Sequence, residues 1–409
     1  MITSCRPSFL LLSLVAAFCS AAFIRLDDNP GALPTCDKCI SEEDILAPGI
    51  GFDITDSYGT AAIRYHNGSV QNLARVDGDE DFQALIRKLA AGPPALDCSR
   101  SLSGWRKFLC WKSHMQRRLN KGRGLPATPD VGTLAVLFEN LRLAVDDELG
   151  EGSCTRALFA LFPTLPGLTY EDFLDAVEYA SLDRVESPYS QDYVSEVSAA
   201  SGAMGFGICR NYTDVYGCLD EESWMPYEQR LFLSFTNTSF TAINSYFRSA
   251  FYPHPTSTQL RFDLGRASFP DNDEDAQRIY WQRIRDTIVK VGLQGLALPS
   301  VLFLVGDHAA DPMFQKTLDE ALQDMFPRHR DDVAGLRRTL EERGQDVVET
   351  SSLDYSFLGA RGAANFAKRS LEAPRFCWEP PGCDAYRYQP SSIPFSGVRG
   401  EQVVLKEGL

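Results

Sequence analysis

The run Val301–Val305 limits the folds open to this chain more than any other segment. A strand that is apolar at every position has no face for water, so it belongs in a sheet that is covered on both sides, as in α/β proteins. Gly306 follows as a turn. Phe314, Leu318 and Leu322 then recur at the spacing of one helical face. This order of strand, turn and helix predicts an α/β fold.

Two earlier segments also combine a strand with a polar loop. Residues 49–63 are predicted to form a strand, a tight turn and a second strand, with Asp53 at the end of the first strand. Residues 230–242 have the same arrangement. The dipeptide Asn67-Gly68 adds a hairpin turn after the first unit, because these residues adopt the backbone angles of tight hairpin turns.

Length and charge restrict the function. A chain of 409 residues is long enough for two lobes with cores of their own. The formal net charge of −15 argues against nucleic acid as a partner, because the phosphate backbone favours clustered Lys and Arg. Solubility accounts for such a charge without any partner.

The N-terminus predicts entry into the secretory pathway. Arg6 precedes an uncharged run, Phe9 to Phe23, which ends near small residues suited to cleavage. The run is too short for a comfortable membrane span, and we predict a signal peptide at residues 1–21 and an extracellular location. A buried N-terminal helix is the alternative. No later segment is apolar enough to span a membrane.

Nine cysteines lie after the signal region, and most of them should be paired in an oxidising compartment. The odd number predicts one free thiol or one intermolecular bond. The pair Cys36 and Cys39 suggests structural disulfides, because the strand and helix of a thioredoxin-like redox site do not follow it. Three glycosylation sequons, at Asn67, Asn211 and Asn237, fit the same compartment.

The segment Trp105–Arg123 is aromatic and carries the dense positive charge of the chain. Two interpretations stay open. The segment meets an anionic partner, or it is a solvated helix that balances acidic neighbours.

The three strand–loop units lie in an order that resembles the actin-like ATPase superfamily, and specifically the nucleotide-binding domain of heat-shock protein 70 (DnaK-type) chaperones. The segment Gly51–Ser57 is similar to the first phosphate loop of that family, and residues 230–240 stand where the second belongs. Residues 304–312 stand where the adenosine loop belongs, and Arg361-Gly362-Ala363-Ala364 resembles the closing helix. The resemblance covers about residues 48–370 and implies a two-lobed, ribonuclease H-like fold that binds ATP with Mg²⁺.

The chain departs from the family at the residues that hold the nucleotide. Asp53, Ser57 and Gly306 are retained, but Thr55 and Asp56 replace a glycine and a threonine in the first loop. Ser234 stands at the second carboxylate position, and Thr236-Asn237-Thr238 replaces three glycines. The second and third loops are 72 positions apart, which predicts a reduced helical subdomain in the second lobe.

We therefore expect a vestigial nucleotide cleft at Asp53, Ser57, Ser234, Thr236 and Gly306, with no catalytic residue, no metal site and no cofactor. The predicted function is a secreted, catalytically inactive scaffold for an unknown protein partner, without a membrane span. The alternative is a divergent ATP- and Mg²⁺-binding protein with slow ATPase activity. The predicted regions are a signal peptide (1–21), an N-terminal lead (22–47), lobe I (48–228), lobe II (229–353), a closing helix that returns to lobe I (354–370) and a Pro- and aromatic-rich tail (371–409).

Overall fold

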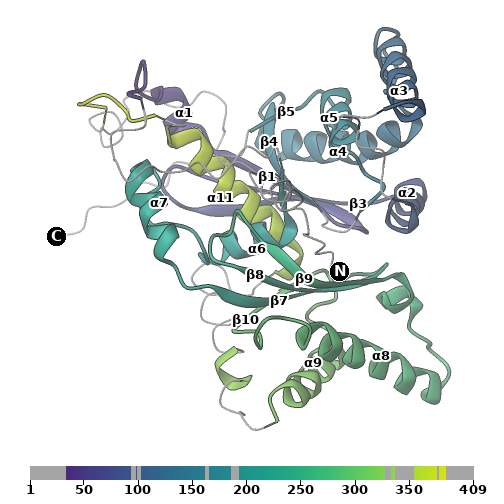
Figure 1. The fold of residues 1–409 in the computed structure, drawn as a ribbon. Coiled ribbons are helices and arrows are strands. Elements are labelled where there is room, and N and C mark those ends of the chain that lie inside the picture. Colours follow the sequence, from purple (N-terminus) through teal and green to yellow (C-terminus); the bar gives the residue numbers. More distant parts are fainter. Residues whose placement is uncertain are drawn as a thin grey trace, which may run out of the picture.

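The computed structural model describes residues 34–93, 98, 103–161, 165–185, 193–327, 333–336, 354–374 and 377–383. The predicted signal peptide, the start of the N-terminal lead, most of residues 328–353 and the tail beyond residue 383 lie outside these residues. The fold is mixed α/β, as the sequence predicts, and it contains two mixed sheets (Figure 1).

The first sheet has the order β3-β2-β1-β4-β5, and β6 pairs with the same β4. Strand β2 is antiparallel to its neighbours β1 and β3, and β4 runs parallel to β1, β5 and β6. The predicted turn at Asn67-Gly68 joins β2 to β3, and Gly68 has a φ of +89°. The strands are β1 Gly49–Ile54, β2 Tyr58–Arg64, β3 Val70–Asp77, β4 Arg156–Leu161, β5 Asp183–Arg184 and β6 Tyr193–Ser195.

The second sheet has the order β10-β7-β8-β9. Its first three strands in the chain are antiparallel neighbours, and β10 runs parallel to β7. In each sheet, the first four strands along the chain lie side by side in the order third, second, first, fourth. In both sheets the fourth strand runs parallel to the first. The predicted strand at residues 301–305 is β10, and it is buried at every position. The strands are β7 Glu228–Phe235, β8 Phe240–Phe247, β9 His254–Arg261 and β10 Val301–Val305.

Helices cover both sheets. Figure 1 shows α6 and α11 between the sheets and α8 with α9 on the outer side of the second sheet. The α-helices are α1 Glu42–Leu46, α2 Glu80–Ala91, α3 Trp105–Lys121, α4 Pro129–Leu149, α5 Tyr170–Tyr179, α6 Glu196–Ala203, α7 Val215–Trp224, α8 Glu274–Gly292, α9 Pro312–Met325 and α11 Leu358–Glu372. Short 3-10 helices lie at Phe262–Leu264, Arg266–Ser268 and Tyr355–Phe357.

Helix α11 packs directly on β1, β2 and β4 of the first sheet and on α6. Small residues make this close approach possible. A Cβ atom on Gly51 would lie 2.1 Å from the backbone nitrogen of Ala364, and one on Gly362 would lie 1.8 Å from the carbonyl oxygen of Ala199. Helix α6 also contacts β10, so it joins the cores of the two sheets.

Local signals predict some helix starts and miss others. In the sequence, Thr169 with Asp172 three residues later predicts a helix cap, and these two residues form a capping box at the start of α5. The sequence predicts Asp130 as the cap of the helix that carries Leu134 and Leu137. In the structure this helix, α4, is capped by Thr128, whose hydroxyl accepts a hydrogen bond from the N–H of Val131, and Pro129 takes the first helical position.

Four disulfides join Cys36 to Cys377, Cys39 to Cys383, Cys98 to Cys110, and Cys209 to Cys218. The ninth cysteine, Cys154, is a buried free thiol, and burial raises its pKa to about 12. These disulfides fit a secreted protein. Among the described residues, no helix is both long and apolar enough to cross a membrane.

Candidate functional site

The loops that follow β1 and β7 are equivalent turns, Thr55–Tyr58 and Thr236–Ser239. In each, the threonine N–H donates to the carbonyl of the fourth residue, at 2.9 Å and 3.0 Å. The N–H of that fourth residue donates back to the threonine hydroxyl, at 3.0 Å in both turns. These side-chain bonds close the turns. The backbone N–H groups of Ser57, Tyr58 and Ser239, which a phosphate loop would offer to a ligand, are therefore already bonded to threonine hydroxyl groups.

The two turns contact each other. The carboxylate of Asp56 accepts a hydrogen bond from the hydroxyl of Thr236 at 3.1 Å and a second, shorter one from the hydroxyl of Thr238. All three side chains are buried. The acidic group of the first loop is thus bound by the hydroxyl groups of the second.

Asp53 lies on β1 and is completely buried. Of the described residues, none donates a hydrogen bond to either of its carboxylate oxygens. Burial raises the pKa of Asp53 to about 8, so the folded protein holds this carboxyl group in its neutral form at pH 7. Helix α11 passes directly over it, since a Cβ on Gly359 would lie 2.2 Å from Oδ2 of Asp53.

Glu196 is a third buried carboxyl group at this place, and sequence reasoning did not find it. It is the first residue of α6, and Ser195 caps the helix. Burial raises its pKa well above the usual range, and the nearby charges of Asp53 and Asp56 raise it further. An acidic residue in the first helical turn is common in proteins, so the sequence carries no signal that sets Glu196 apart.

The other predicted site residues lie in the same region. The N–H of Ser57 donates to the hydroxyl of Thr55 at 3.1 Å. Ser234 is buried on β7, where it pairs with Thr241 and Val305. Gly306 has a φ of +104°, and a Cβ there would lie 2.3 Å from the carbonyl oxygen of Phe235.

The third loop is tied to the first sheet. Asp307 accepts a hydrogen bond at 2.8 Å from Arg75 of β3. The Arg75 guanidinium also lies 4.1 Å from the ring centroid of Tyr58. A further link joins the hydroxyl of Thr60 to the carbonyl of Ser356 at 3.3 Å. Contacts from all three loops therefore hold the two sheets together.

The three sequon asparagines, Asn67, Asn211 and Asn237, are exposed. Asn237 stands between two buried threonines in the turn after β7, and its carbonyl accepts a hydrogen bond from Ala267. Its side chain therefore faces solvent although its neighbours bind Asp56.

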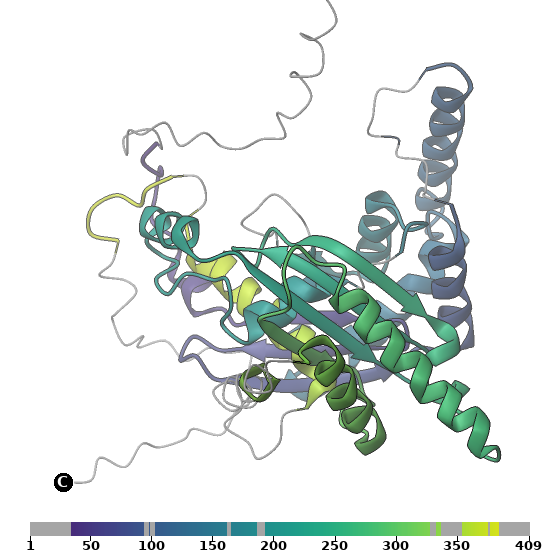
Figure 2. The ribbon, with the colours of Figure 1, turned by 60° about the horizontal axis from the view of Figure 1, so that its bottom comes forward.

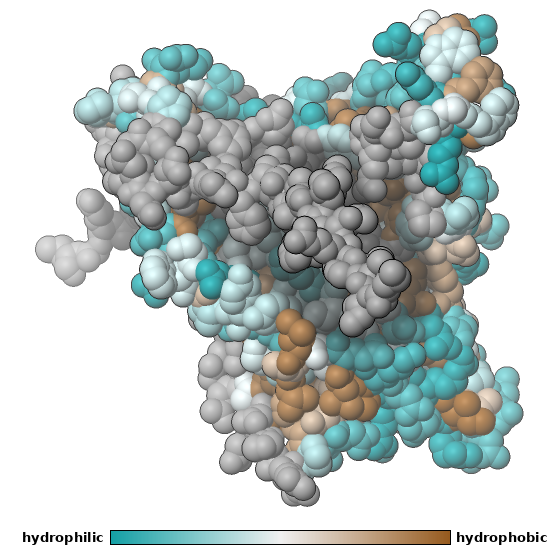
Figure 3. All heavy atoms as spheres, in the orientation of Figure 1, coloured by the Kyte–Doolittle hydropathy of each residue, from teal (hydrophilic) through white to brown (hydrophobic). Residues whose placement is uncertain are grey.

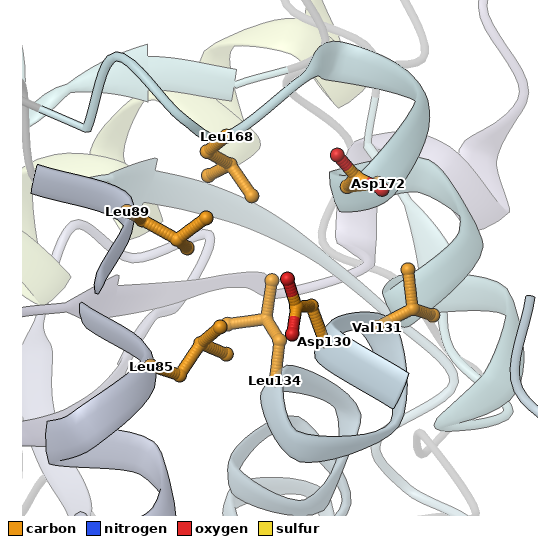
Figure 4. Close-up of a pocket in the computed structure, with 7 residues that line it drawn as sticks. All are labelled: Leu85, Leu89, Asp130, Val131, Leu134, Leu168 and Asp172. Atoms are coloured by element: carbon orange, nitrogen blue, oxygen red, sulfur yellow. The ribbon is translucent and has the colours of Figure 1, made fainter. Parts of the chain in front are cut away.

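A small pocket lies away from these loops, between α2, α4 and the start of α5 (Figure 4). Asp130 and Asp172 stand at its edge, but Lys88 binds the first and Arg117 binds the second. Its remaining lining is aliphatic: Leu85, Leu89, Val131, Leu134 and Leu168. We see no chemistry in this pocket beyond apolar packing.

Another cluster has the composition of a metal site but not its chemistry. Cys209, Cys218 and Glu222 lie close together and are buried. The two sulfur atoms form a disulfide, so neither is a thiolate that could bind a metal ion.

ATP with Mg²⁺ does not fit the residues present. Threonine hydroxyl groups already accept hydrogen bonds from the N–H groups of Ser57, Tyr58 and Ser239, and Asp56 links the two turns. Asp53, Asp56 and Glu196 are buried carboxyl groups with raised pKa values, so burial disfavours the ionised form that would hold Mg²⁺. No protein-family model matches the chain, and no curated protein matches its sequence.

Proposed function

We propose that this chain is a secreted, actin-like ATPase-domain protein of the heat-shock protein 70 type that has lost ATP hydrolysis. It acts as a scaffold that binds a protein partner through its outer surface. Two features support the proposal: the ordered set of family-like loops in the sequence, and the same strand order in both sheets.

The observation that carries the inactive assignment is the contact of Asp56 with Thr236 and Thr238. An active site of this class would need the two turns to surround a phosphate with free N–H groups. Here the turns bond to each other, and Arg75 with Asp307 adds a second tie between the same parts. Opening this contact would leave buried polar groups unpaired, which is costly.

The alternative is a divergent nucleotide-binding protein. The carboxyl groups of Asp53 and Glu196 favour it, because they are buried and accept no hydrogen bond from described residues. Two carboxylates of this kind could orient the hydrated Mg²⁺ that accompanies ATP. The neutral form that burial imposes on Asp53 weighs against it, since a metal ligand must be ionised.

Calorimetric titration of the full chain with ATP and Mg²⁺ decides between these functions. We expect no heat of binding at millimolar nucleotide. The variant Asp56→Ala, which unlocks the turns, should also fail to bind, since the N–H groups stay bonded to threonine. Micromolar binding by the wild type that is lost in Asp53→Ala would overturn the inactive assignment.

A further inference from the structure

Helix α3 stands at the edge of the molecule, clear of both sheets (Figures 1 and 2). Polar groups hold one of its faces against α5. Arg117 is buried and binds Asp172 and Asp175, and Lys121 binds the same Asp175 at 3.0 Å. The disulfide from Cys110 to Cys98 fixes the first half of the helix.

The opposite face of α3 is apolar and open to solvent. We name it the α3 ridge: Trp105, Phe108, Trp111, Met115 and Leu119. Successive members are three or four residues apart, so they form one stripe along the helix. Their exposed fractions range from 43% to 69%. The first three rings lie in a row, with centroids 5.0 Å and 5.9 Å apart; the first pair is stacked and the second is tilted.

This arrangement reverses the usual amphipathic helix, whose apolar stripe faces the core. The polar face of α3 points to the protein, and the apolar ridge points to water. An exposed contiguous apolar patch rimmed by polar residues marks an interaction site. Figure 3 shows apolar and hydrophilic residues side by side at the α3 end of the molecule.

Basic residues border the ridge. Lys107, Lys112 and Arg118 are exposed on the same helix. The segment Trp105–Arg123 holds seven Lys and Arg residues and no Asp or Glu, in a chain whose net charge is −15. The charge is therefore strongly separated, with the positive end at α3.

We propose that the α3 ridge binds the surface of an anionic membrane, with α3 lying flat in the interface. Tryptophan rings favour the boundary between headgroups and acyl chains, and Lys and Arg beside them reach anionic headgroups. The acidic body is repelled by the same surface, which orients the molecule with α3 toward it. The ion pairs from Arg117 and Lys121 to α5 fix α3 before it binds, so little conformational entropy is lost on docking.

Two other occupants fit less well. A second copy of α3 would bring two cationic helices together, and like charges along a helix pair are unfavourable. A protein partner would need a groove that matches a convex row of stacked rings. A lipid interface accepts such a row without a shaped pocket.

Sedimentation of the full chain with phosphatidylcholine vesicles, with and without phosphatidylserine, tests the proposal. We expect binding to the anionic vesicles that weakens as salt is added. The ridge variant Trp105→Ser, Phe108→Ser, Trp111→Ser should bind at least about tenfold more weakly. Its side chains are exposed, so it should fold normally. The charge variant Lys107→Gln, Lys112→Gln, Arg118→Gln should lose the preference for phosphatidylserine.

A matched control removes exposed apolar groups elsewhere. Trp224 and Leu296 are 81% and 76% exposed and lie outside α3, and the variant Trp224→Ser, Leu296→Ser should bind vesicles like the wild type. Two results would overturn the proposal: no binding of the wild type to anionic vesicles, or equal binding of the ridge variant. A ridge-dependent dimer in sedimentation velocity without vesicle binding would assign the ridge to self-association instead. These outcomes are independent of ATP binding.

Discussion

The two sheets share one plan but differ in the chemistry of their equivalent loops. Asp53 and Ser234 both precede the turn threonine by two positions, and Asp56 and Asn237 both follow it directly. The first sheet therefore carries a carboxyl group at both places, and the second carries a neutral group at both. The backbone bonds of the turns are otherwise the same.

This difference makes the two halves complementary. The second turn supplies hydroxyl donors from Thr236 and Thr238, and the first supplies the acceptor Asp56. Two turns that carried only donors, or only acceptors, could not form these hydrogen bonds with each other. The two loops are therefore bonded to each other, and three predictions test this comparison in order of expected effect.

The largest effect is expected from Ser234→Asp, which gives the second sheet the carboxyl group of the first. Ser234 is 4% exposed, so the substitution buries a carboxyl group that must either ionise away from water or remain neutral above its ordinary pKa. The free energy of unfolding at pH 7 should fall by roughly 3–5 kcal/mol in urea denaturation. Ser113→Asp on the exposed surface of α3 is the control. Recovery of stability on addition of Mg²⁺ would favour the nucleotide-binding alternative.

The second prediction concerns Asp53→Asn, which imitates the neutral acid. The pKa of Asp53 is about 8 in the folded protein against an ordinary value of 3.8, so the unfolded chain loses this proton first as the pH rises. The contribution of Asp53 to stability is complete below the ordinary pKa and is lost as the pH rises to about 8. The variant should therefore be more stable than the wild type at pH 7, by on the order of 3 kcal/mol, and similar to it near pH 4.

Urea denaturation of both proteins across this pH range measures the difference. A variant that is less stable at every pH would mean that Asp53 is ionised and paired in the folded protein.

The smallest effect is expected from the two turn threonines. Thr55→Val and Thr236→Val each remove the hydroxyl that closes a turn, at a cost of about 1–3 kcal/mol in thermal or urea unfolding. Thr236→Val should cost more, because it also removes a donor to Asp56. Thr317→Val is the control, since that hydroxyl donates to a carbonyl within α9. If the two variants lost equal stability, the hydrogen bond from Thr236 to Asp56 would not contribute to joining the turns.

Sequence reasoning succeeded where the cause is local. The hairpin at Asn67-Gly68, the capping box at Thr169 and the buried strand at Val301–Val305 depend on residues close in the chain. The start of α4 was missed by two residues, because Thr128 and Asp130 are both good caps and only the path of the chain decides.

The site could be predicted only in part, because its contacts are distant in the sequence. Asp56 and Thr238 are 182 positions apart, and their bond depends on how the sheets meet. The positive charge of α3 can be recognised in the sequence, but the sequence does not show which face of the helix packs against α5. The ion pairs of Arg117 with Asp172 and Asp175 fit a helix that balances acidic neighbours, whereas an anionic partner for the exposed face stays a proposal.

The disulfides from Cys36 to Cys377 and from Cys39 to Cys383 close almost the whole described chain into a ring. They span 341 and 344 positions and connect the segment before α1 with the segment after α11. A protease that cuts one exposed loop inside this ring would not release a fragment. The cleaved protein would remain one covalent particle until it met a reductant. In an oxidising environment, the molecule can therefore be cut once inside this ring and still keep its two sheets covalently joined.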